Sequence, residues 1–223
     1  MAAVGPKKAS NDARERVLDA TAKLLKEKGY ASLRLRDVGT LTGFQAGSLY
    51  YYIESKDQLV EDVLMEGLRR VLAFVRTRVD EMPASATPFE RLTVAVASHL
   101  EMALEITDYS GAYIGVLPQL PEDIRARVLK EEHRFLQYWH RLISDAQEAG
   151  QLRKDIDARA MRILLVGALN AAAAAVRVTD AETWTYNATA LLDGLVARDS
   201  SGRLMTAVET PAAAERRPRR AAN

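Results

Sequence analysis

Residues 45–56 gather small, hydroxyl-bearing and cationic side chains in one short stretch. Ala46 and Ser48 are small enough to let the start of a helix approach another molecule closely. The Ser48 hydroxyl can donate or accept at a base edge, and the Ala46 methyl group can touch a thymine methyl. Lys56 stands where the next helix would begin, and free N–H groups there favour a phosphate. Three tyrosines offer hydroxyls to phosphates and flat faces to sugars: Tyr50, Tyr51 and Tyr52. Each residue alone is typical of a half-buried surface, but the ordered set indicates contact with DNA.

Two short helices joined by a glycine turn are predicted to position these side chains. Ser32 is predicted to cap the first helix, because its hydroxyl can accept from a free backbone N–H. Gly39 leaves room for a second helix to cross, and Gly43 can take the left-handed conformation that ends the first helix. Phe44 and Leu49 are expected to fill the angle between the two helices. Apolar residues recur in the first helix at helical spacing: Leu35, Val38 and Leu41. This is the plan of a helix-turn-helix, whose second helix enters the major groove of DNA.

Helical patterns continue through the rest of the chain. Ser55 and Gln58 have the spacing of a capping box, which predicts a helix starting at Lys56. Thr87 and Glu90 form a second cap around Pro88. No stretch alternates like a β-strand, so an all-α fold is expected. Besides the two short helices, six predicted helices cover about residues 12–28, 56–79, 88–106, 109–116, 157–178 and 180–197. A further helix is expected to begin after Pro121 and to end near residue 149.

The run RDVGTLTGFQAGSLYYYIESKDQL resembles the DNA-binding signature of the TetR family of transcriptional regulators. The resemblance covers about residues 14–64. The sequence departs from the family at three positions: Thr42 replaces the usual Ala, Gln45 the usual Ser or Thr, and Ile53 the usual Phe. It implies an N-terminal three-helix helix-turn-helix domain and a C-terminal helical ligand-binding and dimerisation domain. Together with the exposed faces, it predicts that Arg36, Gln45, Ser48 and Tyr51 lie near bases of double-stranded DNA in a palindromic operator. Tyr50, Tyr52 and Lys56 are expected to contact phosphate and sugar.

Charge divides the chain into three parts, although the net charge is only +1. Residues 1–56 carry ten Lys/Arg against six Asp/Glu, residues 57–197 fifteen against twenty-one, and residues 198–223 six against three. Basic ends around an acidic middle suit a protein that meets DNA at its N-terminal end. We therefore predict a DNA-binding domain over residues 11–56, a ligand-binding and dimerisation domain over 57–198, and a disordered basic tail over 199–223. Residues 1–10 are interpreted as a flexible arm.

The composition favours a cytoplasmic protein. The chain has no cysteine, which excludes disulfides and thiolate chemistry. The N-terminus lacks the pattern of a secretion signal, and the apolar stretch 163–176 is shorter than the roughly 20 residues that a membrane span needs.

Residues 163–176, ILLVGALNAAAAAV, carry small side chains on nearly every face. Another helix could approach this segment closely, and an apolar stripe is expected on the last helix: Leu191, Leu192, Leu195 and Val196. The simplest alternative is packing within one chain. However, a helix-turn-helix reader usually acts as a dimer on two half-sites, and this chain has one reading unit. The family resemblance implies a homodimer formed by the last two helices of each chain.

The predicted body could enclose a pocket for a small-molecule effector, lined by His99, Met102, Tyr113, Phe135, Trp139 and Asn170. Core filling is the better interpretation of each residue alone, but polar groups collected among apolar helices favour a ligand cavity. The segment GALN, followed by small residues and Arg177, faintly resembles family members that respond to CoA thioesters. In that case Arg177 or Arg134 would pair with the phosphates of the ligand.

Two other classes of protein remain open. His133 and His140 lie seven residues apart, which is too far for the usual pair of metal ligands on one helix, so no metal is expected. The sequence has no Gly-rich phosphate loop, GxSxG or HExxH, and no cofactor is expected. A hydrolase with an unrecognised site is one alternative. An architectural DNA-binding protein without an effector is the other, although the long body argues against it.

Overall fold

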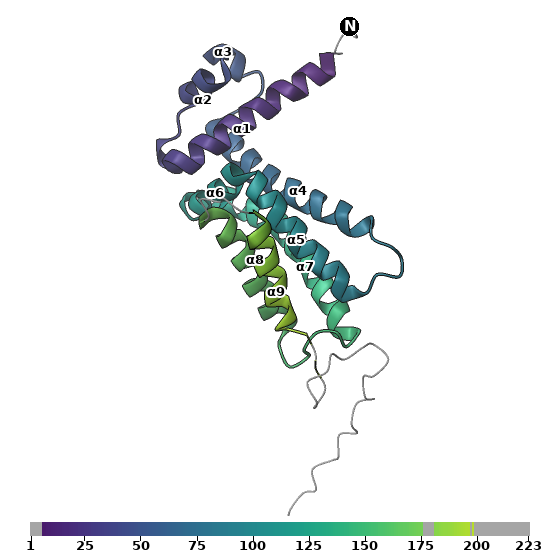
Figure 1. Cartoon of the computed structure of the whole chain (residues 1–223). Helices are drawn as coiled ribbons and strands as arrows, with labels where there is room; N and C mark the ends of the chain where they lie inside the picture. Colours follow the sequence, from purple (N-terminus) through teal and green to yellow (C-terminus); the bar gives the residue numbers. More distant parts are fainter. Residues whose placement is uncertain (1–5, 176–180, 197, 199–223) are drawn as a thin grey trace, which may run out of the picture.

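The computed structural model describes residues 6–175, 181–196 and 198. These residues are mostly helical, and Leu152 and Val196 form an isolated antiparallel bridge. Figure 1 shows a small head of α1–α3 at one end, from which α4 runs into a larger helical body. The helices are α1 (Pro6–Ser32), α2 (Leu35–Thr42), α3 (Ala46–Leu49), α4 (Lys56–Asp80), α5 (Pro88–Glu105), α6 (Thr107–Val116), the 3-10 turn η1 (Leu117–Gln119), α7 (Glu122–Glu148), α8 (Ala158–Ala175) and α9 (Ala181–Asp193). None of the helices described combines the length and apolar character of a bilayer span.

Helix α1 is longer than the sequence pattern predicted. It begins at Pro6, so residues 6–10 are helical and not part of a flexible arm. Gly29 interrupts it with a φ of 73° and a ψ of 174°, and a last turn follows to Ser32. The predicted break at Gly29 is therefore correct, but helical structure resumes beyond it. The buried side of α1 carries Val17, Leu18, Ala22, Leu24 and Leu25.

The turn between α2 and α3 has the predicted geometry. Gly43 ends α2 in the left-handed region at φ 74°. A Cβ added at Gly39 would lie 2.9 Å from the carbonyl oxygen of Phe44 and 3.3 Å from Cδ1 of Leu49, so glycine is needed for the close crossing. Two details differ from the prediction. Arg34, not Ser32, is the residue that precedes α2, and Leu41 is 50 % exposed because the buried face ends at Val38 and Thr42.

Two long helices, α4 and α5, begin at the predicted caps. The Ser55 hydroxyl accepts from the backbone N–H of Gln58 at 3.0 Å, but the Gln58 amide donates to Asp62 instead of closing a capping box. At α5 the box is complete: the backbone N–H of Thr87 donates to Glu90 at 2.7 Å and that of Glu90 to the Thr87 hydroxyl at 3.2 Å.

Helix α9 is shorter than expected. It ends at Asp193, so Leu195 and Val196 are not on its surface. The two leucines of the predicted apolar stripe that remain on α9 face different ways. Leu192 is buried in the core of its own chain, whereas Leu191 is 74 % exposed. Residues 176–180 and 199–223, which include Arg177 and the predicted tail, lie outside the described residues.

The hydrophobic core has two parts, and the first joins the head to the body. It contains the apolar faces of α1–α3 and the start of α4, together with Tyr109, Ala112 and Val116 of α6 and Ile124 and Val128 of α7. The second lies deeper in the body, around Trp139. Because α6 packs against α1 of the head and against α4, a displacement of α6 would change its contacts with both helices.

Candidate functional site

The exposed face of α3 presents the predicted base-contacting residues. Gln45 precedes α3, and its side chain makes no capping hydrogen bond, so it is available to reach outward. Ser48 is exposed on the same short helix, and Tyr51 is 85 % exposed just after it. Arg36 projects from α2, with 76 % of its side chain exposed and Asp37 3.7 Å away. These side chains are free to meet a major groove, whereas Ala46 can be placed only by its backbone, as the first residue of α3.

Tyr50 and Tyr52 differ in their surroundings. Tyr50 is 62 % exposed, as a phosphate contact requires. Tyr52 packs partly against the first core, with its ring 5.7 Å from that of Phe44 and 5.5 Å from that of Tyr51. Tyr52 therefore packs beneath the exposed face of α3 and also lies at the edge of that face.

Two residues that the sequence did not single out hold this surface in place. The Arg16 guanidinium donates to the carbonyl oxygen of Thr42 at 2.5 Å and lies over the Phe44 ring at 5.1 Å. The ammonium of Lys56 lies 4.6 Å from the centre of the Tyr30 ring. Tyr30 donates its hydroxyl proton to Asp57 at 2.7 Å, and burial together with Asp57 raises the pKa of Tyr30 to about 12. The Lys56 ammonium, the predicted phosphate contact, is thus positioned by the Tyr30 ring.

A narrow, partly open cavity lies in the body, beside the head. Its volume is about 30 Å³, room for only one or two water molecules. It is lined by Gly67, Leu68, Val71, His99, Ile106, Tyr109, Ser110, Tyr113, Ile114, Phe135 and Asn170. Four of the six predicted pocket residues therefore line it. Met102 and Trp139 do not: Met102 is half-buried, and Trp139 is fully buried with its ring 5.5 Å from His99.

His99 is a buried ionisable group in the lining of the cavity. It is 1 % exposed, and its Nε2 lies 3.0 Å from Oδ1 of Asn170. Burial lowers the pKa of His99 to about 4, and the Asn170 hydrogen bond offsets only part of that effect. His99 is therefore neutral at physiological pH.

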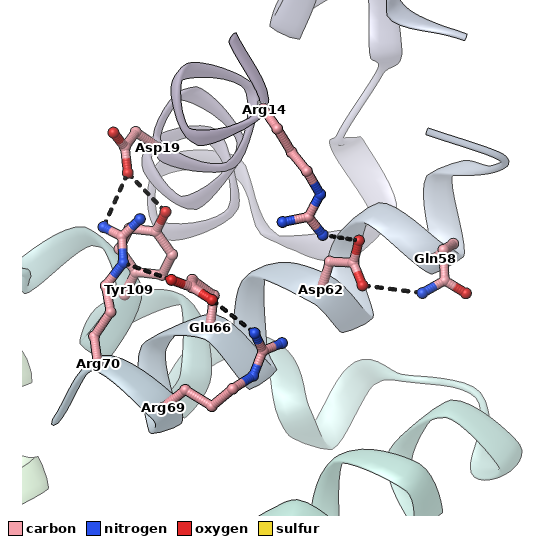
Figure 2. A network of polar contacts seen from close by, with 8 residues as sticks. All are labelled: Arg14, Asp19, Gln58, Asp62, Glu66, Arg69, Arg70 and Tyr109. Atoms are coloured by element: carbon pink, nitrogen blue, oxygen red, sulfur yellow. Dashed lines mark hydrogen bonds and ion pairs between the residues drawn. The ribbon is translucent and has the colours of Figure 1, made fainter. Parts of the chain in front are cut away.

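Tyr109 lines this cavity and is also bonded to the head, and Figure 2 shows its contact with Asp19. Its hydroxyl donates to Asp19 of α1 at 2.7 Å, and Arg70 of α4 donates to the same carboxylate at 3.3 Å. Arg70 also donates to Glu66 at 2.9 Å, and its guanidinium lies 4.7 Å from the centre of the Tyr109 ring. The three helices α1, α4 and α6 thus meet at one polar cluster. No local sequence signal predicts it, because Asp19 and Tyr109 are 90 residues apart.

A second ion pair joins α1 to α4, nearer the start of each helix. Arg14 donates to Asp62 at 2.7 Å, and Gln58 donates to the other oxygen of the same carboxylate at 3.0 Å (Figure 2). Both clusters fix the angle at which α1 crosses α4. That angle determines where α3 points relative to the body.

A helix-turn-helix on a helical body that encloses a cavity defines a DNA-binding transcriptional regulator. Residues 17–63 match the family described as "Bacterial regulatory proteins, tetR family", and residues 85–174 match "Tetracyclin repressor-like, C-terminal domain". The chain belongs to the TetR family of transcriptional regulators.

Known relatives have the same architecture. The HTH-type transcriptional repressor KstR2 of Mycolicibacterium smegmatis is 28 % identical over 151 residues, which cover 65 % of this chain and 69 % of that protein. The Fatty acid metabolism regulator protein of Bacillus subtilis is 19 % identical over 69 % of this chain and 78 % of its own length. Among solved structures, KstR2 of Mycobacterium tuberculosis superposes with a TM-score of 0.71 at 20 % identity, over 83 % of this chain and 95 % of that one. FadR of Bacillus subtilis in complex with stearoyl-CoA has a TM-score of 0.68 at 16 % identity, over 80 % and 96 %.

Proposed function

We propose that this protein is a repressor that binds a palindromic operator as a homodimer and leaves it when a small, largely apolar effector enters the body. The observation that carries the proposal is the cluster at Tyr109, which lines the cavity and is hydrogen-bonded to the head. Operator binding by α3 and effector binding in the cavity are thereby parts of one mechanically connected unit. Such a protein acts in the cytoplasm, where its DNA lies.

The exposed apolar residues of α8 and α9 support the dimer. Both helices pack against α5, which leaves their other faces outward. Leu164 is 73 % exposed and Leu191 74 %, and Ile163, Trp184 and Tyr186 are exposed as well. A monomer rarely leaves so many large apolar side chains together in water, so a second copy is the natural cover. Two heads in a symmetric dimer would then meet two half-sites.

An acyl-CoA is the effector class that we favour. FadR of Bacillus subtilis was solved with stearoyl-CoA, and the cavity here is lined mainly by apolar side chains. At about 30 Å³ the cavity is far too small for an acyl chain, so the chain must part its walls. Arg134 does not line the cavity, because it is exposed and forms an ion pair with Glu131 at 3.0 Å. The phosphates of CoA could therefore reach Arg134 only from outside the body.

Helix α6 is the wall whose displacement would release DNA. It supplies Tyr109, Ser110, Tyr113 and Ile114 to the cavity and also packs against α1. An acyl chain that pushes α6 outward would shift α1 and change the separation of the two heads. A tenfold loss of operator affinity needs only about 1.4 kcal/mol of preference for the shifted state.

The direct test uses the purified protein, a fragment of DNA from upstream of its own gene, and a series of acyl-CoA thioesters. We expect a shifted complex that is abolished by at least one thioester, with free fatty acids and unrelated aromatic compounds as controls. Binding to arbitrary duplexes with equal affinity would instead favour an architectural protein. Binding of thioesters without release of DNA would make the cavity incidental to regulation.

The enzyme hypothesis has less support. His133 is exposed on α7 and hydrogen-bonded to Gln137 at 2.9 Å, and His140 is exposed two turns further on. Among the described residues, no group of three or more potential metal ligands is gathered. Repressors among the relatives favour regulation over catalysis.

A further inference from the structure

Two side chains that line the cavity each have a buried polar atom with no hydrogen-bond partner within 3.5 Å. These atoms are Nδ1 of His99, on α5, and the hydroxyl oxygen of Tyr113, on α6. Both residues line the same narrow space. A buried polar group without a partner costs roughly 1–3 kcal/mol, so native proteins rarely keep one unless a ligand or another function uses it.

The hydrogen bond to Asn170 determines what His99 can offer. A carbonyl oxygen only accepts, so Nε2 carries the proton that points to Oδ1 of Asn170 at 3.0 Å. Nδ1 is then a bare acceptor, and it stays so because burial lowers the pKa of His99 to about 4. A ligand that fits this end of the cavity must bring a hydrogen-bond donor.

Tyr113 offers the opposite capability. Burial raises the pKa of Tyr113, and the charge of Glu132 and a hydrogen-bonding interaction with its carboxylate raise it further, so the Tyr113 hydroxyl keeps its proton and can donate it to a ligand in place of Glu132. The lining residues include no lysine or arginine. A carboxylate or phosphate would therefore meet the negative charge of Glu132 with no cation in the cavity to compensate, which would be unfavourable in this buried space.

We propose that the buried end of the effector carries an uncharged alcohol hydroxyl, which donates to Nδ1 of His99 and accepts from the Tyr113 hydroxyl. A hydroxyl satisfies both orphaned atoms at once. A ketone would satisfy only Tyr113, and a methyl group neither. The inference rests on the proposed effector site and narrows it from an acyl-CoA to a hydroxyacyl-CoA whose hydroxyl lies deep in the body.

The experiment compares three forms of each acyl-CoA. Octanoyl-, dodecanoyl- and hexadecanoyl-CoA are tested by calorimetry on the full chain, each with a methyl, a hydroxyl or a carboxylate at the far end of the acyl group. We expect the hydroxyl form of at least one length to bind roughly tenfold or more tightly than its methyl form, because the site leaves polar atoms unpaired with the latter. The carboxylate form should bind most weakly.

Two tyrosine variants provide the matched control. Tyr113→Phe removes one cavity hydroxyl and should reduce the ratio of affinities between the hydroxyl form and the methyl form. Tyr138→Phe removes another buried hydroxyl without a partner, but Tyr138 does not line the cavity, and the preference should be unchanged. Equal binding of methyl and hydroxyl forms at every length would overturn the inference and leave the acyl-CoA effector standing. Failure of all nine thioesters to bind would overturn the proposed effector itself.

Discussion

The hydroxyl of Tyr109 donates to Asp19 at 2.7 Å, which joins a wall of the cavity to the first helix of the DNA-binding head. Arg70 of α4 reaches the same carboxylate, so α4 and α6 both meet the head at this point. The contact is charge-assisted, and an outward displacement of α6 would lengthen it.

Tyr109→Phe should weaken the coupling between these sites. The ring remains as a cavity wall, so we expect acyl-CoA affinity to change little. Loss of a hydrogen bond to a charged group should lower the free energy of unfolding by about 1–2 kcal/mol. The release of operator by a saturating thioester should become smaller, as measured by fluorescence anisotropy of labelled DNA. Unchanged release would show that the signal travels by another route.

Gly67→Ala tests the close packing of α4 on α6. A Cβ at Gly67 would lie 3.2 Å from Cβ of Tyr109, whereas a Cβ at Gly115, in α6, would meet nothing within 4 Å. Alanine normally stabilises a helix by about 0.5–1 kcal/mol relative to glycine. We therefore expect Gly115→Ala to raise the melting temperature and Gly67→Ala to lower it or leave it unchanged. A rise of similar size in both variants would mean that α6 accommodates the added methyl group without strain.

Lys56→Ala should weaken binding to every DNA sequence. Removing one phosphate contact should reduce the slope of log affinity against log salt by about 1. Lys154→Ala makes the same change of charge in the loop between α7 and α8 and should leave the slope unchanged. Ser48→Ala, in contrast, should alter the preference among operator variants. An altered preference with an unchanged salt slope in Lys56→Ala would reverse the roles assigned to these residues.

Leu164→Glu combined with Leu191→Glu should give a monomer. Both leucines are more than 70 % exposed, so the substitutions cost little within one chain, but a dimer would have to bury four carboxylates. Leu129→Glu, at a 41 % exposed position of α7, is the control that should remain dimeric. Sedimentation velocity distinguishes the two states. A folded dimer of the double variant would place the interface on another face.

The stability of the protein should fall as the pH is lowered from about 6.5 to about 4. Burial lowers the pKa of His99 to about 4, whereas an unfolded histidine titrates near 6.5. Between these values the unfolded chain binds the extra proton, so His99 alone removes up to about 3 kcal/mol of stability, and none further below pH 4. His99→Gln keeps a polar group for Asn170 but cannot titrate. The free energy of unfolding of the unsubstituted protein and of His99→Gln is measured in urea from pH 7.5 to 4.5. The difference between the two values should vary with pH. A constant difference would mean that His99 is not buried in the neutral form.

Local signals in the sequence were enough to predict the helices and the reading head. Gly43 ends α2 in a left-handed conformation, and Thr87 and Glu90 cap α5, because each of these interactions involves residues at most a few positions apart. The ordered run from Arg36 to Lys56 likewise identified the exposed face of α3, since its side chains are placed by two short helices and one turn. Errors at Ser32, Leu41 and the end of α9 arose where packing, not propensity, decided which residues continue a helix or face the core.

Only the tertiary structure decided how the sites are built and connected. The sequence placed Trp139 beside the other pocket residues, but the helix packing buries it behind His99 in the core. It gave no reason to join Asp19 to Tyr109, or Arg16 to the turn at Thr42, because those contacts depend on the angles at which α1 crosses α4 and α6. Helical periodicity determines which face of each helix is apolar. The crossing of several such faces, far apart in the chain, determines which polar atoms remain in the space between them.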